Sequence, residues 1–144
     1  MIILDTNVLS EILKPIPDSA VSQRMFSVSR LQMHTTAIGM AEILLGMDLM
    51  PLGRKRNLLV PKVTELFSEE FAGKMLPFDR EAAGVYAEIV AFRRRSGRPI
   101  TVFDAQIAAI ARRHAAILCT RNIKDFVGCE ISLWNPWEQD CPSA

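Results

Sequence analysis

Several features that would place a chain in a specialised class of protein are scarce or missing in this sequence. No apolar run approaches the roughly 18–20 residues that a membrane-spanning helix needs. The first residues carry no basic segment, so we expect neither a signal peptide nor a membrane anchor. The three cysteines, Cys119, Cys129 and Cys141, have no zinc-ligand spacing and leave one thiol over in any pairing. We therefore expect reduced thiols and a cytoplasmic protein.

An excess of charge of one sign is also absent. The chain has 17 basic and 16 acidic residues, a net charge of +1, so affinity for a nucleic acid must come from local arrangement. Its 144 residues, 49% of them hydrophobic, suffice for one continuous core. We expect a single domain spanning residues 1–144.

Short apolar segments alternate along the chain with segments of helical periodicity. The pattern predicts strands at 2–4, 31–35, 75–76, 116–119 and 131–133. It predicts helices at 6–13, 18–29, 37–45, 53–72, 79–95 and 102–113, with Thr36 and Asp79 as N-caps and a stop at Gly46. This alternation is typical of an α/β domain with a mainly parallel sheet, and it leaves the strand order open.

Three acidic residues stand out by their positions. Asp5 directly follows the first strand, where open α/β sheets bind ligands; it could equally cap the helix that follows. Glu42 interrupts the apolar helix at 37–45, and a buried carboxylate there requires a cation or an arginine as its partner. Asp104 lies within the apolar segment 100–108, where it could also be an acid favoured by the first turn of a helix.

A fourth group of polar residues follows the strand that ends at Cys119. Thr120, Asn122 and Asp125 supply a hydroxyl, an amide and a carboxylate, although Asp125 could be an ordinary loop residue. Several carboxylates cannot lie close together and all stay ionised unless a cation neutralises them. Oxygen ligands without a nearby Cys or His indicate Mg²⁺ or Mn²⁺ rather than Zn²⁺.

The same residues carry a resemblance to a known family. The order and spacing of four blocks resemble PIN-domain proteins, above all the VapC-type toxins and the FitB-like plasmid-stability proteins: Ile3-Leu4-Asp5-Thr6-Asn7-Val8-Leu9-Ser10-Glu11, Ala41-Glu42-Ile43 with Gly46, Phe103-Asp104-Ala105-Gln106-Ile107-Ala108, and Thr120-Arg121-Asn122-Ile123-Lys124-Asp125-Phe126. The resemblance covers essentially the whole chain.

The resemblance implies a three-layer α/β/α fold with a parallel sheet of about five strands. It also implies a Mg²⁺- or Mn²⁺-dependent endoribonuclease, the toxin of a toxin–antitoxin pair, with Asp5 and Asp104 as direct metal ligands and Glu42 as a ligand through water. Many relatives carry an aspartate where this chain has Asn122, so Asp125 could fill the fourth acidic position, or Asn122 could act as a neutral ligand. The second-shell or substrate-positioning residues expected by the same resemblance are Thr6, Asn7, Thr120, Arg121 and Asn122.

The partners expected from the resemblance are RNA, a cognate antitoxin seated in a groove between the amino-terminal helices, operator DNA reached only through that antitoxin, and a second copy of the chain. The chain has two basic groups, one made of Arg93, Arg94, Arg95 and Arg98 and the other of Arg121 and Lys124. Either group could hold RNA phosphates, or could be an ordinary solvated helix end or loop.

Three other functions fit the sequence less well. A phosphatase of the haloacid dehalogenase type needs an acid two positions after the first aspartate, where this chain has Asn7. A phosphoacceptor signalling domain needs an acidic pair near the first strand and a lysine at a late strand end, which here reads Thr120-Arg121-Asn122. An inactive PIN scaffold that only binds its antitoxin is the remaining alternative, because of Asn122.

Overall fold

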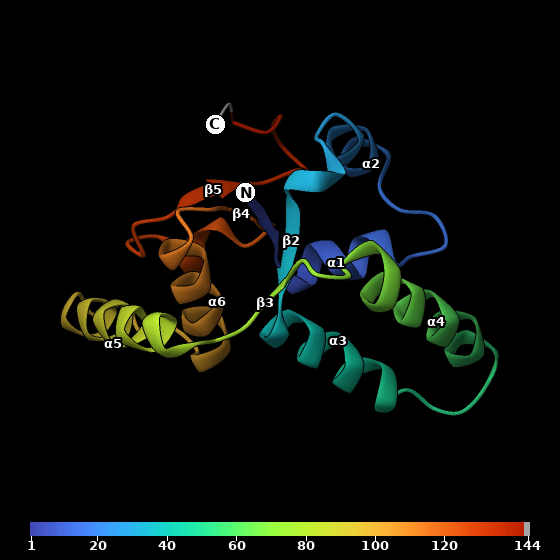
Figure 1. Ribbon diagram of the computed structural model, residues 1–144, viewed down its shortest axis with the longest axis horizontal. Coiled ribbons are helices and arrows are strands. Elements are labelled where there is room, and N and C mark those ends of the chain that lie inside the picture. Colours follow the sequence, from blue (N-terminus) through green and yellow to red (C-terminus); the bar gives the residue numbers. More distant parts are fainter. Residues whose placement is uncertain (143–144) are drawn as a thin grey trace.

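A five-stranded parallel sheet forms the centre of the computed structural model, which describes residues 1–142 (Figure 1). The strands are β1 (Ile2–Leu4), β2 (Met33–Thr36), β3 (Met75–Leu76), β4 (Ile117–Cys119) and β5 (Ser132–Trp134), in the order β3-β2-β1-β4-β5. The central strand pairs on both sides, with Ile2 opposite Met33 and Ile117. All three residues of β1 are buried, as expected for a strand covered on both faces. The predicted α/β fold with a parallel sheet is confirmed.

Helices connect the strands and cover both faces of the sheet. They are α1 (Thr6–Ile12), α2 (Ser19–Phe26), α3 (Ala37–Asp48), α4 (Arg54–Glu65), α5 (Arg80–Arg95) and α6 (Val102–Arg113). Short 3-10 turns occupy Arg30–Gln32 and Ile123–Phe126, and a π-helical turn, Leu66–Glu70, continues α4. No helix within residues 1–142 is long and apolar enough to cross a membrane.

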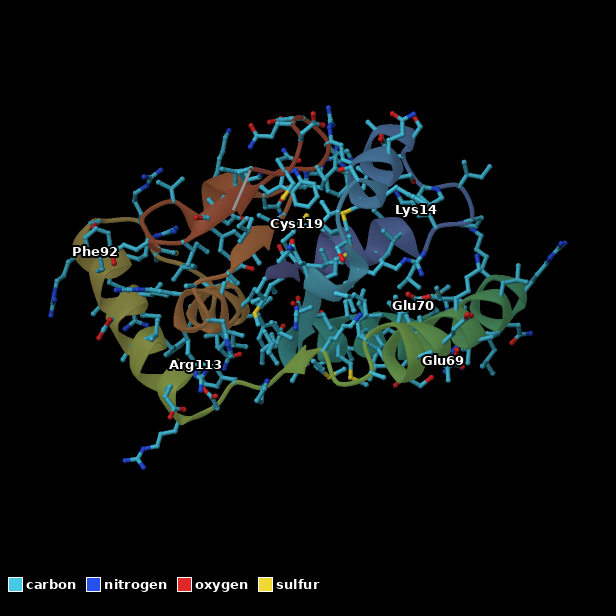
Figure 2. The ribbon with its side chains drawn as sticks, turned by 45° about the horizontal axis from the view of Figure 1, so that its top comes forward. Lys14, Glu69, Glu70, Phe92, Arg113 and Cys119 are labelled. Carbon is cyan, nitrogen blue, oxygen red and sulfur yellow. The ribbon has the colours of Figure 1, made fainter. Side chains whose placement is uncertain are left out.

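Two hydrophobic cores lie on opposite faces of the sheet, because successive side chains of a strand point to opposite faces. Ile3 and Leu118 pack with α5 and α6, whereas Ile2, Leu4 and Trp134 pack with α1, α3 and α4. Figure 2 shows the same division: Phe92 and Arg113 lie on the side of α5 and α6, and Lys14, Glu69 and Glu70 lie on the other. The expected three-layer α/β/α arrangement is confirmed.

Several predicted element boundaries are wrong. The strand predicted at 31–35 begins only at Met33, because Arg30–Gln32 form a 3-10 turn. The helix predicted for 18–29 is shorter, because Asp18 lies outside it as N-cap and the chain turns after Phe26. The helix predicted to stop at Gly46 continues to Asp48, because Gly46 keeps ordinary helical backbone and its surroundings are open. The segment predicted as one helix at 53–72 changes from α to π geometry at Leu66.

Other local predictions hold. The side chains of Thr36 and Asp79 accept N-cap hydrogen bonds from Gly39 and Ala82. Cys119, Cys129 and Cys141 are free thiols, as expected from their spacing.

The carboxyl ends of the strands meet at one edge of the sheet. There the backbone N–H of Asp5 donates to the carbonyl oxygen of Cys119 at 2.9 Å, and the N–H of Thr120 donates to that of Trp134 at 2.9 Å. The first residues after β1 and β4 are thereby held against the last residues of β4 and β5. Parallel topology thus brings together parts of the chain more than one hundred residues apart.

Candidate functional site

Asp5 is the most buried acidic residue at this edge, with 5% of its surface exposed. One carboxylate oxygen, Oδ1, accepts the backbone N–H of Thr6 at 2.8 Å, so Asp5 does serve as N-cap of α1. The other oxygen, Oδ2, accepts the hydroxyl of Thr120 at 2.7 Å and the side-chain amide of Asn7 at 3.1 Å. Asp5 therefore both caps α1 and belongs to a polar cluster.

A hydrogen-bond network ties β1 to the segment after β4. Asn7 donates to the hydroxyl oxygen of Thr120 at 3.2 Å, and its own side-chain oxygen accepts the backbone N–H of Arg121 at 3.1 Å. The N–H of Asn122 donates to the same Thr120 oxygen at 3.1 Å. These contacts fix the orientation of the Asp5 carboxylate.

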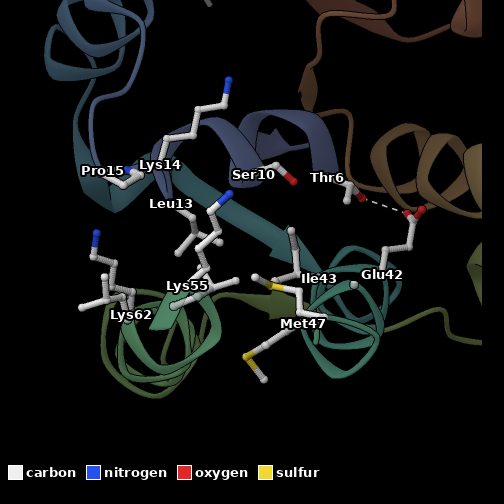
Figure 3. A pocket seen from close by; sticks show the side chains of 14 residues that line it. Thr6, Ser10, Leu13, Lys14, Pro15, Glu42, Ile43, Met47, Lys55 and Lys62 are labelled. Atoms are coloured by element: carbon white, nitrogen blue, oxygen red, sulfur yellow. Dashed lines mark hydrogen bonds between the residues drawn. The ribbon is translucent and has the colours of Figure 1, made fainter. Parts of the chain in front are cut away.

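Glu42 faces this cluster from α3. Its Oε1 accepts the hydroxyl of Thr6 at 2.8 Å, which links α3 to the start of α1 (Figure 3). Glu42 is half-buried rather than fully buried. The helix α3 is covered on one face only, and its outer face is apolar but exposed. Among residues 1–142 it makes no ion pair with an arginine, so the salt-bridge alternative is not what the structure shows.

Asp104 lies in the first turn of α6, and its N–H donates to the N-cap hydroxyl of Thr101 at 3.3 Å. Burial raises the pKa of the half-buried Asp104 carboxyl, and the negative charge of Asp125 raises it further. Asp125, in the turn Ile123–Phe126, is exposed to solvent. The structure thus brings Asp125 within electrostatic range of Asp104, whereas Asn122 contacts Thr120.

The pKa of Asp5 records how the acids influence one another. The pKa of Asp5 is raised from the ordinary value of 3.8 to about 6, chiefly by burial and to a smaller extent by the charges of Asp104 and Glu42. The hydrogen bonds from Thr120 and Thr6 act in the opposite direction. Asp5, Glu42 and Asp104 therefore form one acidic neighbourhood.

This neighbourhood is more open than the tight convergence that we expected from the sequence. Within residues 1–142, no three His, Cys, Asp or Glu side chains are close enough to form a complete metal-binding set. Mg²⁺ commonly takes only one or two protein carboxylates and keeps several waters, so it does not need a closed set. The all-oxygen donors fit a hard divalent cation better than Zn²⁺.

An apolar groove begins beside Glu42 and runs between α1, α3 and α4. Its volume is about 460 Å³. Thr6 and Glu42 lie at one end, and the opposite end carries the three lysines Lys14, Lys55 and Lys62 (Figure 3). Its floor consists of side chains from all three helices, among them Leu13, Ile43, Met47, Leu58 and Leu59.

Arg93 does not have the role that its basic cluster suggested. Only 6% of its surface is exposed, and its guanidinium donates to the carbonyl oxygens of Arg98, Asp125 and Val127. A buried cation satisfied by backbone carbonyls is not available to a phosphate. It instead joins the end of α5 to the loop that precedes Asp104 and to the turn that carries Asp125.

Sequence reasoning also missed two residues near this edge, Arg24 and Trp137. Arg24 of α2 binds the segment that follows β5, and the guanidinium of Arg121 lies over the ring of Trp137. Both contacts join residues far apart in the sequence. A tryptophan in a polar segment was the only available signal.

Comparison with known proteins identifies the family to which this chain belongs. The family described as PIN domain matches residues 2–126. The chain belongs to the PIN-domain family. This PIN-domain protein is 36% identical over 137 residues to "Toxin FitB" of Neisseria gonorrhoeae, a match that covers 95% of this chain and 99% of that protein. It is also 36% identical to "VapC ribonuclease Y4jK" of Sinorhizobium fredii, over 96% of this chain and 99% of the relative.

A solved structure shows the same relationship for the fold. A chain from the structure of FitAB bound to the IR36 DNA fragment superimposes with a TM-score of 0.91 at 35% identity, covering 99% of this chain and 100% of that chain. The resemblance to FitB-like and VapC-type proteins expected from the sequence is thus confirmed.

Proposed function

We propose that this PIN-domain protein is a divalent-metal-dependent endoribonuclease, the toxin of a toxin–antitoxin pair. One observation carries the proposal: the Asp5 carboxylate is buried at the carboxyl edge of the sheet, and burial, together with the charges of Asp104 and Glu42, raises its pKa. The ribonuclease name of a relative that matches almost the whole chain supports the same chemistry.

In this proposal Asp5 and Asp104 bind Mg²⁺ or Mn²⁺ directly, Glu42 binds through water, and Asp125 completes the acidic set in place of Asn122. The bound cation would acidify a water molecule and offset negative charge at the phosphate during hydrolysis. The products would carry a 5′-phosphate and a 3′-hydroxyl.

The surrounding side chains orient the acids and the substrate. Thr120 and Asn7 hold the Asp5 carboxylate, and Thr6 holds Glu42 through its hydroxyl. Because each of these donors is itself anchored in a strand end or a helix start, the carboxylates are fixed before substrate arrives. Arg121, exposed directly after Thr120, is placed to contact RNA phosphate next to the acidic site.

The inhibitory partner is proposed to occupy the groove between α1, α3 and α4. Its apolar floor suits an apolar anchor, and the lysines at one end favour an acidic segment of the partner. Glu42 at the other end favours a basic side chain there. Such an antitoxin would cover the approach to Thr6 and Glu42, and it would connect the protein to operator DNA.

We further propose that residues 1–144 form one PIN domain that acts in the cytoplasm as a homodimer. The exposed apolar side chains of Leu45 in α3 and of Leu49 directly after it offer contact surface for a second copy.

A cleavage assay with Asp5→Asn tests the proposed activity. Structured RNA is incubated with wild-type protein or variant in Mg²⁺, in Mn²⁺ and in EDTA. We expect cleavage by the wild type with either metal, none in EDTA, and a loss of at least about a hundredfold in Asp5→Asn. Asp18→Asn is the matched control, since Asp18 caps α2 away from the acidic site.

Two results would contradict the proposal. Full activity in a correctly folded Asp5→Asn protein would remove Asp5 from the site. A wild-type protein that cleaves no RNA with either metal, but still binds its antitoxin, would favour the inactive scaffold.

A further inference from the structure

The segment after β5 brings an aromatic ring to the same edge of the sheet as Asp5. Trp137 lies three residues beyond the end of β5 and is partly exposed. The guanidinium carbon of Arg121 lies 5.0 Å from the centroid of its ring. The backbone N–H of Arg121 donates to Asn7, which in turn donates to Asp5. The ring and the guanidinium are therefore in contact, and the backbone of Arg121 adjoins the acidic site.

The backbone on both sides of Trp137 is fixed by Arg24 of α2. The Arg24 guanidinium donates to the carbonyl oxygen of Pro136 at 2.9 Å and to that of Glu138 at 3.3 Å. The N–H of Trp137 donates to the side-chain oxygen of Asn135 at 3.0 Å. Trp137 also packs against the core that contains Leu4 and Trp134. The ring is thus a rigid support and not part of a loose tail.

Arg121 differs from the other two arginines of this region. Arg24 donates to two backbone carbonyls and to the Asp140 carboxylate, and Arg93 donates to three backbone carbonyls. Within residues 1–142 the guanidinium of Arg121 makes no hydrogen bond or ion pair, and the residue is exposed. A guanidinium held over an aromatic face keeps its N–H fork available while it loses conformational freedom.

We propose that Trp137 positions Arg121 as a phosphate-binding fork for the nucleotide next to the scissile bond of single-stranded RNA. The ligand class is a phosphodiester, because a planar guanidinium matches two phosphate oxygens. Trp137 acts through Arg121 and is a positioning residue. The inference rests on the proposed ribonuclease function and adds to it a substrate contact outside the acidic cluster.

RNA fits this surface better than a protein segment does. The surface offers the unpaired guanidinium of Arg121 beside the ring of Trp137, and the acidic site is nearby. A strand of RNA that passes the acidic site could therefore have its next phosphate bound by this guanidinium. An apolar protein segment would instead find its contacts in the groove between α1, α3 and α4. The two surfaces are chemically distinct and can be separated by mutation.

The test combines Trp137→Leu, Trp137→Phe, Arg121→Ala and the double variant Trp137→Leu/Arg121→Ala. Cleavage of a single-stranded RNA gives KM and kcat, and the Asp5→Asn background gives Kd without turnover. Arg30→Ala is the charge-matched control, since Arg30 precedes β2 at the opposite edge of the sheet and is exposed.

We expect Trp137→Leu to raise KM and Kd about threefold to tenfold with little effect on kcat, and Trp137→Phe to keep most of the affinity. Arg121→Ala should lower the slope of log Kd against log salt by about one. The double variant should bind no more weakly than Arg121→Ala, because Trp137 has no role once the guanidinium is gone. Arg30→Ala should match the wild type in Kd.

Unchanged RNA affinity in a folded Trp137→Leu protein would overturn the inference and leave a protein partner as the occupant of this surface. Additive losses in the double variant would overturn the positioning role. Both results are compatible with an active wild-type ribonuclease, so they leave the proposed function intact. A wild type that neither binds nor cleaves RNA would overturn the function and this inference together.

Discussion

The hydroxyl of Thr120 donates a hydrogen bond of 2.7 Å to Oδ2 of Asp5, across 115 positions of the sequence. Thr120 is fully buried, and its oxygen also accepts N–H groups from Asn7 and Asn122. One side chain therefore orients the central carboxylate and organises the loop that follows β4.

Thr120→Val should lower cleavage activity by about tenfold to a hundredfold, in line with losses seen when partners of metal ligands are removed. The hydrogen bond from Thr120 lowers the pKa of Asp5, so its loss raises that pKa. The acidic limb of the pH–activity profile should consequently move to higher pH. Thr120→Ser keeps the hydroxyl and should keep both activity and profile; a Val variant with a wild-type profile would contradict this assignment.

Divalent metal should stabilise the wild type in thermal unfolding. At a free metal concentration one hundred times Kd, a single site that binds only the folded state adds about 2.7 kcal/mol. Asp104→Asn should lose most of the rise in Tm produced by Mn²⁺, because it removes a proposed ligand. Glu70→Gln, an exposed acid paired with Arg30, should respond like the wild type. Equal rises in all three proteins would show that Mn²⁺ binds elsewhere.

Arg93→Met should destabilise the fold by at least about 2 kcal/mol, because three carbonyl oxygens lose a charged donor. Urea unfolding measures the loss, with the exposed neighbour Arg94→Met as control. Arg93→Lys should recover only part of the stability, since an ammonium lacks the planar fork. A stable Arg93→Met protein would mean that water replaces the guanidinium at these carbonyls.

Leu58→Glu should prevent binding of the antitoxin while leaving RNA cleavage intact. Leu58 lines the groove and is 58% exposed, so the substitution places a charge on the docking surface without disturbing the core. Co-purification with the cognate antitoxin measures the effect. Leu52→Glu is the matched control, since Leu52 is equally apolar, more exposed at 86% and outside the groove. Continued binding by Leu58→Glu would exclude the groove as the antitoxin site.

Much of the fold could be predicted because the signals are local. The apolar triplet at 2–4 identifies the central strand, and Thr36 and Asp79 cap helices through contacts three residues away. The position of Asp5 directly after a buried strand indicates the carboxyl edge of a parallel sheet. These predictions need only the periodicity of strands and helices and the chemistry of their ends.

Boundaries and partners required the tertiary structure. Gly46 could not be known to continue its helix, since its effect depends on what surrounds it. Arg93 and Arg121 are both arginines in basic segments, yet one is buried among carbonyl oxygens and the other is exposed over Trp137. Residue type alone cannot separate these roles.

The sequence by itself determined the elements, the parallel sheet and the acids at its edge, because each depends on residues close together in the chain. Only the tertiary structure decided that Thr120 holds Asp5, that the charge of Asp125 acts on Asp104, and that Arg24 braces the segment of Trp137. Such contacts are set by the path of the chain through space, which brings a given donor within about 3 Å of one acceptor among many.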